Sequence, residues 1–350
     1  MTLAPSDIFS HLPLDTLDII LRHAGGADLA SICRVSKLFR AHALDALYRD
    51  LSLTSDRSLK ACFSIIDDPS VAARVKYFAV HSNNAGSFYG VIQETLTLLP
   101  NLRALELFTG GHGSCEWILP TDPNSCPFQL HTFLTDFQYT PDVGAFVARQ
   151  RGLQHLKVPW SGGASYFGNL DFLGLPHLAK IAAPFSLVEA LVPSRPVREV
   201  ATFRDRSNIH PDRISCLTKS TAVAGIERLR INLNFLRDIG PDLLARTLPS
   251  LSCLVVDCDP REQDLIGWVS SFLTGFPRLH CFNLRLDLHL PRYMMGNPYV
   301  PPLSGEQDLQ YFTFSVGGRR LGYAGTRVGN AWTRCPADEA AWLLAHSAFN

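Results

Sequence analysis

A short apolar motif that recurs along the chain is the feature that most constrains its fold. The motif has an apolar residue, two residues of any type, a second apolar residue, one more residue and usually a third apolar residue. The mean interval between motifs is 26 residues, with a range of 19 to 30, and a period of this size indicates stacked repeats. The motifs begin at Val75, Leu102, Leu130, Leu153, Leu178, Val197, Ile226, Leu251, Leu279 and Leu309.

Two further signals describe the inside of a repeat. A turn-forming residue such as Asn83, Gly110 or Asp259 stands shortly beyond most motifs. Helical periodicity or a helix-capping residue follows in several intervals, for example in residues 87–99, after Asp142 and in residues 261–276. Strand and helix therefore alternate, which predicts an irregular α/β solenoid with a parallel strand stack on its concave face. A non-repetitive α/β domain with short buried strands is the alternative.

The first 50 residues follow a different pattern, that of three short helices. Pro13 opens the first, and the Gly25-Gly26 pair stops it. Residues 28–34 form the second, and Ser36 is an expected N-cap for the third. Apolar residues recur at helical spacing on the first and third helices, at Leu14, Leu17, Ile20, Leu21, Phe39, Ala43 and Leu47.

This segment resembles an F-box in the order and spacing of Leu12-Pro13, Leu17, Ile20, Asp28-Leu29, Val35-Ser36-Lys37, Phe39 and Leu47-Tyr48-Arg49. Asp15 stands where the family usually has Glu, and Tyr48 where Trp is common. The resemblance implies binding to the Skp-type adaptor of a cullin-based SCF ubiquitin ligase. It implies that the residues that contact the adaptor, or support that contact, are Leu12, Pro13, Leu17, Ile20, Leu29, Val35 and Phe39. The alternative is a helical cap whose apolar stripes serve only the core.

The repeat segment resembles the leucine-rich-repeat substrate domains found behind F-boxes, and the combination is similar to the expanded F-box families of filamentous fungi. We therefore expect an F-box-like helical domain at 8–53 and a leucine-rich-repeat-like solenoid at 54–350. We expect a C-terminal cap at about 326–350, with a helix that opens near Cys335 and Pro336. The resemblance implies a non-catalytic substrate receptor that holds a protein client. A repeat scaffold that acts outside any ubiquitin ligase is the second interpretation.

Composition narrows the classes of partner. The 350 residues carry 32 Lys and Arg against 32 Asp and Glu, and this balance disfavours broad electrostatic binding to nucleic acid or to an anionic membrane. We find no apolar run long enough for a membrane span and no signal peptide, so we expect a cytoplasmic or nuclear protein. The nine cysteines and twelve histidines are dispersed without a C-x-x-C pair, so we expect reduced, buried thiols and neither a metal site nor a cofactor.

The residues that alternate with the buried motif positions are expected on the concave face. Many of them in the second half are basic, which suggests an acidic or phosphorylated client segment, although acids alternate with them. A solvated strand face is the alternative. In the loop 291–302, two Met and two Tyr predict an adaptable contact surface. The client-binding candidates are His155, Lys157, Lys180, Arg228, Arg230, Arg285, Tyr293 and Tyr299.

Catalytic signatures are mostly absent from the sequence. It has no nucleophile elbow, no phosphate loop and no H-E-x-x-H motif. The stretch Gly110-Gly111-His112-Gly113-Ser114-Cys115 places a histidine and a cysteine in one turn, and a hydrolase built on His112 and Cys115 is the remaining enzyme hypothesis. We expect a turn there and no catalytic activity.

Overall fold

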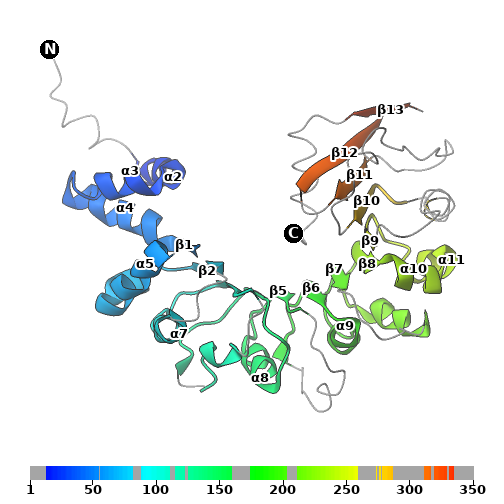
Figure 1. The fold of residues 1–350 in the computed structure, drawn as a ribbon, viewed down its shortest axis with the longest axis horizontal. Helices are drawn as coiled ribbons and strands as arrows, with labels where there is room; N and C mark the ends of the chain where they lie inside the picture. The colour runs from blue at the N-terminus through cyan, green and yellow to red at the C-terminus, as the bar shows by residue number, and fades with distance from the viewer. Residues whose placement is uncertain are drawn as a thin grey trace. The chain divides into compact units, whose positions relative to one another are not determined.

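The structure is a computed structural model that describes residues 13–54, 56–81, 88–110, 115–122, 125–159, 174–202, 211–258, 273, 276, 278–286, 311–316, 319–328 and 331–334. The chain divides into two compact units. The N-terminal unit comprises Met1–Phe137 with Pro141–Gln150, and the C-terminal unit comprises Gln138–Thr140 with Arg151–Asn350. Strands and helices alternate in both units, which are described separately below (Figure 1).

The three helices predicted at the start of the N-terminal unit are present: α2 (Leu14–His23), α3 (Gly26–Ile32) and α4 (Lys37–Arg49). Pro13 is the N-cap of α2, where its fixed φ suits the entry into a helix. The Ser36 hydroxyl caps α4, since it accepts a hydrogen bond from the amide of Phe39 at 3.2 Å. Helix α3 begins at Gly26, two residues before the predicted start.

These helices, here called the helical trio, enclose a small apolar core. Leu17 and Leu21 lie one turn apart on α2 and are buried with Leu29 of α3 and Ala43 of α4. Partly buried side chains complete this core: Ala24, Ile32, Cys33, Phe39, Ala46 and Leu47. The trio therefore has a hydrophobic core of its own and leads directly into the first strand.

The remainder of the N-terminal unit is a parallel sheet with helical connections. Its strands pair in chain order, β1 with β2, β2 with β3 and β3 with β4. The elements are β1 (Asp50–Leu53), α5 (Asp56–Asp67), α6 (Pro69–Ala72), β2 (Tyr77–His81), α7 (Tyr89–Thr97), β3 (Ala104–Phe108), the 3-10 helix η2 (Glu116–Ile118), β4 (Thr132–Thr135) and α8 (Pro141–Arg149). Strand β1 lies inside the range 8–53 that was predicted as an F-box-like helical domain, so the sheet starts before the first predicted motif.

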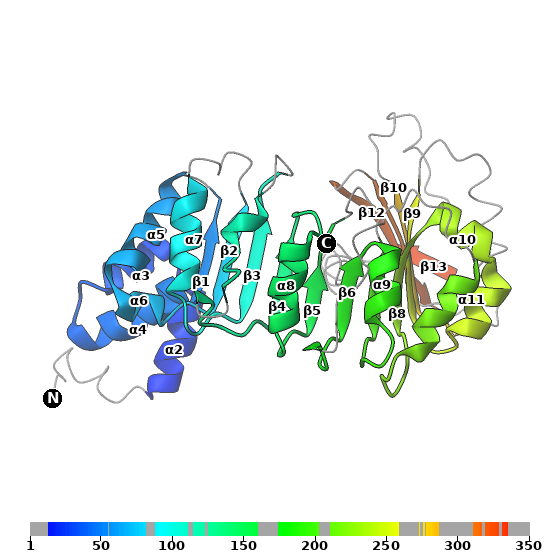
Figure 2. The same cartoon turned by 90° about the horizontal axis from the view of Figure 1, so that it is seen from below.

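The C-terminal unit continues the same alternation. Strands β5 to β11 pair in parallel in chain order, and β12 and β13 follow as antiparallel neighbours. Helix α9 contacts β6 and β7, and α10 contacts β8 and β9 (Figure 2). The elements are β5 (His155–Lys157), β6 (Lys180–Ala183), α9 (Phe185–Leu191), β7 (Glu199–Thr202), the 3-10 helix η6 (Pro211–Lys219), β8 (Arg228–Asn232), α10 (Leu233–Ile239), α11 (Pro241–Thr247), β9 (Cys253–Cys258), β10 (Cys281–Leu286), β11 (Tyr311–Val316), β12 (Arg319–Val328) and β13 (Ala331–Arg334).

Every predicted apolar motif contains a strand that starts two residues after the first apolar residue. That first residue is buried in each of the nine motifs from Val75 to Leu279. The next residue hydrogen-bonds to the preceding repeat, as in the amide of Arg103 to the carbonyl of Lys76 at 2.8 Å and the amide of His131 to the carbonyl of Arg103 at 2.7 Å. This stacking of strand-and-helix units confirms the predicted α/β repeat solenoid within each unit.

The described end of the chain is strand. Residues 326–328 and 331–334, inside the predicted cap, belong to β12 and β13. The helix predicted from Cys335 lies outside the described residues, as does nearly all of the helix predicted at 261–276. The compact units also divide the predicted solenoid near residue 150, so that the helical trio groups with β1 to β4.

Candidate interaction surfaces

The structure sorts the seven F-box-like candidates into core and surface positions. Leu17 and Leu29 are buried in the core of the trio, and Phe39 packs against that core. Pro13, Ile20 and Val35 are exposed, and Leu12 lies outside the described residues. The predicted set therefore contains residues that hold the trio together and residues that are free to meet a partner.

Two further large apolar residues of the trio are exposed and were missed in the sequence analysis. The exposed fractions are 57% for Ile19, 53% for Ile20, 70% for Val35 and 53% for Leu38. We call these four residues the exposed apolar set. Leu38 is the second residue of α4, and Ile19 lies off the core stripe of α2. Helical periodicity measured against the core stripe of each helix could have found both.

Charged side chains form a row across neighbouring strands of the C-terminal unit. The row lies on the described side of the sheet that points away from the buried motif residues. Lys180, Glu199 and Arg228 are in register on β6, β7 and β8. The Glu199 carboxylate lies 3.0 Å from the Lys180 ammonium and 3.7 Å from the Arg228 guanidinium. One largely buried carboxylate thus lies between two cations.

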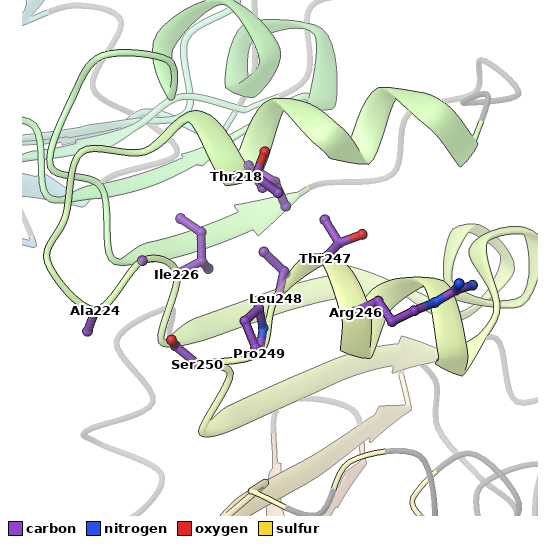
Figure 3. A pocket seen from close by; sticks show the side chains of 10 residues that line it. Thr218, Ala224, Ile226, Arg246, Thr247, Leu248, Pro249 and Ser250 are labelled. Atoms are coloured by element: carbon purple, nitrogen blue, oxygen red, sulfur yellow. The ribbon is translucent and has the colours of Figure 1, made fainter.

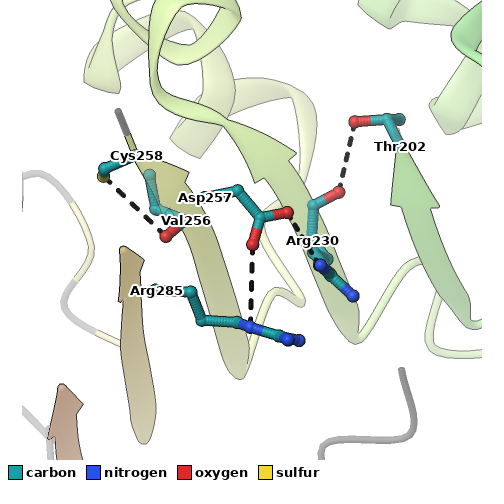
Figure 4. Close-up of polar contacts among 6 residues, drawn as sticks. All are labelled: Thr202, Arg230, Val256, Asp257, Cys258 and Arg285. Atoms are coloured by element: carbon teal, nitrogen blue, oxygen red, sulfur yellow. Dashed lines mark hydrogen bonds and ion pairs between the residues drawn. The ribbon is translucent and has the colours of Figure 1, made fainter. Parts of the chain in front are cut away.

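A second charged group lies further along the same face. Arg230 Nε lies 2.8 Å from Asp257 Oδ2, and Arg285 Nε lies 3.8 Å from Asp257 Oδ1 (Figure 4). The Thr202 hydroxyl donates to the backbone carbonyl of Arg230 at 3.3 Å and ties β7 to β8. As in the first group, one carboxylate lies between two cations.

These two groups and their neighbours form what we call the charged face. The predicted basic candidates of β5 to β10 all lie on it, and the acids that alternate with them are ion-paired to them. Five cations against two carboxylates leave an excess of three positive charges among its described residues. The charged face consists of Lys157, Lys180, Glu199, Arg228, Arg230, Asp257 and Arg285.

His155 begins the row that contains Lys180, with which it is in register. Burial, assisted by the nearby Lys180 and Lys157 ammonium groups, lowers the pKa of His155 to about 4. Its Nε2 is buried and has no hydrogen-bond partner among the described residues. His155 is therefore neutral at physiological pH and adds no charge to the row.

The two aromatic client-binding candidates belong to a loop that the structure does not describe. Tyr293 and Tyr299, with the rest of the loop 291–302, lie outside the described residues. Trp117 of η2 is partly exposed and makes an edge contact with Tyr89 at a ring separation of 6.2 Å. The loop proposal therefore stays a prediction.

A cavity of about 300 Å³ lies between η6, the turn before β8 and helix α11 (Figure 3). Its lining includes the apolar side chains of Ile226 and Leu248. The hydroxyls of Thr218 and Thr247 donate to carbonyls of their own helical segments, those of Ser215 and Leu243. These two hydroxyls are thus occupied locally and offer little to orient a ligand.

The enzyme hypothesis gains no support from the geometry. His112 lies outside the described residues, and Cys115 is buried and hydrogen-bonded to Tyr89. Burial is the main cause that raises the pKa of the Tyr89 hydroxyl, and the bond to Cys115 adds to it. Within the described ranges, no group of three or more His, Cys, Asp or Glu could hold a metal ion. No helix among the described residues is long and apolar enough to cross a membrane.

Comparison with solved structures finds a likeness to a leucine-rich-repeat protein. No family model matches the chain. No curated protein matches it either. The leucine-rich repeat-containing protein LegL7 from Legionella pneumophila is 13% identical over 68% of this chain and 85% of its own, with a TM-score of 0.41. The assignment of a repeat solenoid rests on the strand order and hydrogen bonding described above.

Proposed function

We propose that this chain is the substrate receptor of an SCF-type ubiquitin ligase, in which the helical trio binds a Skp-type adaptor and the repeats bind a protein client. The observation that carries the proposal is the exposed apolar set. Ile20 and Val35 stand at positions that the F-box resemblance implies for adaptor contact, and both are more than half exposed. Leu17 and Leu29, at neighbouring positions of the same motif, form the core that holds them in place.

The energetics favour a partner for these side chains. Full burial of one Val, Leu or Ile side chain is worth about 1.5 to 3 kcal/mol. Four such residues exposed on one small helical domain are therefore a source of binding energy that folding of the trio leaves unused. Exposed apolar groups of this kind are typical of protein-interaction surfaces.

The charged face supports a client with negative charge. Its cations exceed its carboxylates by three, and Arg guanidinium groups suit bidentate contacts to carboxylate or phosphate. Glu199 and Asp257 already engage several of these cations, so a client must compete with them. A phosphorylated segment competes better than an unmodified acidic one, because a phosphate carries up to two charges.

In this proposal the protein makes and breaks no bond. It acts by raising the effective concentration of a client near the ubiquitin-charged enzyme. It needs no cofactor, and it operates in the cytoplasm or nucleus, where ubiquitin ligases meet their clients.

Co-expression of the full chain with a Skp-type adaptor tests the first half of the proposal. The expected result is a stoichiometric complex in size-exclusion chromatography. A folded chain that elutes apart from the adaptor would contradict ligase assembly, and the protein would then be a repeat scaffold that acts outside any ubiquitin ligase.

A charge-reversed variant tests the second half. Fluorescence anisotropy with an acidic peptide, in its phosphoserine and unmodified forms, should show tighter binding of the phosphorylated form and weaker binding at higher salt. The Arg228→Glu, Arg230→Glu variant should lose this binding. Arg246→Glu is the matched control, because Arg246 is an exposed arginine on α11, outside the charged face. Equal binding by the charge-reversed variant and the wild type would contradict the proposed binding of a negatively charged client.

A further inference from the structure

Two cysteines lie side by side at the end of the charge row. Cys253 on β9 and Cys281 on β10 are direct register partners in parallel strands. Parallel strands lie about 4.8 Å apart, and a disulfide needs a Cα separation of about 4.4 to 6.8 Å. In-register residues of parallel strands also point to the same face of a sheet. The backbone thus holds the two side chains next to each other on one face, at a Cα separation suited to a disulfide.

The two thiols already interact. The Cys253 and Cys281 side chains interact as a hydrogen-bonding pair, and both residues are reduced and partly exposed. This hydrogen bond is the main cause that lowers the pKa of Cys253, against the effect of burial, and the nearby Arg228 guanidinium lowers it further. The pKa of Cys281 is raised by the same bond and by burial. Cys253 is therefore the better nucleophile of the pair.

Cys258, five residues further along the chain, lacks this arrangement. Cys258 lies on the same strand as Cys253, but it is fully buried and its register partner is Leu286. Its thiol donates weakly to the carbonyl of Val256, with a sulfur–oxygen distance of 3.8 Å. Cys258 is thus a natural internal control for any chemistry at Cys253.

We propose that Cys253 and Cys281 form a redox-active dithiol that closes to a disulfide when the protein meets a peroxide. The Cys253 thiol first releases its proton, and the thiolate attacks one peroxide oxygen. The O–O bond breaks, Cys253 becomes a sulfenic acid, and the second oxygen leaves as hydroxide that takes up the released proton to form water. The Cys281 sulfur then attacks the sulfenic sulfur, its proton joins the leaving hydroxyl, and a second water departs. Both sulfurs are oxidised, and the peroxide is reduced to two waters.

The cysteine pair lies next to the charged face, so its oxidation changes the surroundings of that face. Successive register pairs run from Glu199 to Arg228, from Arg228 to Cys253 and from Cys253 to Cys281. Closure of the disulfide removes the titratable thiol next to Arg228. The row of charged residues on β6 to β8 is therefore followed, on β9 and β10, by a cysteine pair that can be oxidised. Its chemistry is independent of the adaptor and of any client.

Peptide mapping of the full chain tests the proposal. The reduced protein is treated with hydrogen peroxide, blocked with N-ethylmaleimide, and cut with trypsin. Trypsin places Cys253 in the peptide 247–261 and Cys281 in the peptide 279–285. The expected result is a disulfide-linked pair of these peptides that a thiol reductant separates, with fragmentation that assigns the link to Cys253.

Single variants make the outcome decisive. The Cys258→Ser variant should form the link in full, although residue 258 lies in the same tryptic peptide as Cys253. Cys281→Ser should lose it and leave a sulfenic acid at Cys253 that dimedone captures. The proposal is overturned if the folded wild type shows both thiols still alkylated by maleimide after peroxide, or if the link to Cys281 comes from Cys258.

Discussion

Arg230 and Asp257 form an ion pair diagonally across two neighbouring strands. Arg230 is in register with Val255 and Asp257 with Asn232, yet Arg230 Nε lies 2.8 Å from Asp257 Oδ2. Both side chains are largely buried. The same carboxylate also faces Arg285, so it holds two guanidinium groups together on the charged face.

Replacing this carboxylate should therefore destabilise the C-terminal unit. Asp257→Asn leaves the largely buried Arg230 guanidinium and the more exposed Arg285 guanidinium without their counter-charge, and we expect a loss of about 1 to 3 kcal/mol in the free energy of unfolding. Urea denaturation followed by circular dichroism measures it. Glu189→Gln is the control, because Glu189 pairs with Arg213 near the surface and its loss should cost less than about 1 kcal/mol. Equal effects of the two substitutions would contradict a structural role for the Asp257 bridge.

His155 should make the stability depend on pH below neutrality. Its pKa is lowered to about 4 in the folded state, against an ordinary value of about 6.5. Between these values the unfolded chain binds the proton more readily, so stability falls as pH drops from 6.5 toward 4 and levels off below. The loss reaches at most about 3 kcal/mol. His155→Asn removes this contribution, and urea midpoints from pH 4 to 7.5 should show a flatter profile in the variant than in the wild type. Parallel profiles would contradict the assignment.

The cap of α4 should be a measurable part of the stability of the trio. Ser36→Ala removes the hydroxyl that accepts the Phe39 amide, and loss of such a cap costs about 1 kcal/mol. Ser31→Ala serves as the control, because the Ser31 hydroxyl only donates back to the carbonyl of Ala27 within α3. Thermal and urea unfolding should separate the two variants, and a Ser36→Ala protein as stable as the control would contradict the capping role.

Core and surface positions of the F-box-like segment should differ sharply in their effect on folding. Leu29→Ala opens the core of the trio and should cost about 2 to 5 kcal/mol in the free energy of unfolding. Val35→Ala, at an exposed position, should change it by less than about 0.5 kcal/mol. Similar losses for both variants would mean that Val35 is packed in solution and is not available to a partner.

The repeats could be predicted from the sequence because one buried residue per motif fixes the start of each strand. The same signal extends to the strand that was missed. Tyr48, Leu51 and Leu53 repeat the motif 27 residues before Val75, and β1 starts two residues after Tyr48. These residues also form the end of the predicted F-box-like segment. One stretch of chain ends α4 and opens the sheet at the same time.

The ion pairs and the dithiol were harder to predict. Motif spacing places Lys180, Glu199 and Arg228 in one row, but the diagonal contact from Arg230 to Asp257 depends on side-chain reach across the sheet. Cys253 and Cys281 occupy the same place in successive motifs, and their scatter along the sequence hid this pairing. Helical spacing places Ile20 and Leu21 on the same apolar side of α2. Only the packing of the three helices shows that Leu21 is buried and Ile20 is exposed.

The most direct test of the proposed function is the affinity of the full chain for a purified Skp-type adaptor, measured by isothermal titration calorimetry. Wild type should bind with one-to-one stoichiometry. An Ile20→Asp, Val35→Asp variant should lose at least about tenfold in affinity, a difference of about 1.4 kcal/mol, while its unfolding curve stays close to that of wild type. Val223→Asp, at a fully exposed apolar residue of the C-terminal unit, should bind like wild type. A wild-type protein that is folded and gives no binding heat at any accessible concentration would contradict the adaptor role.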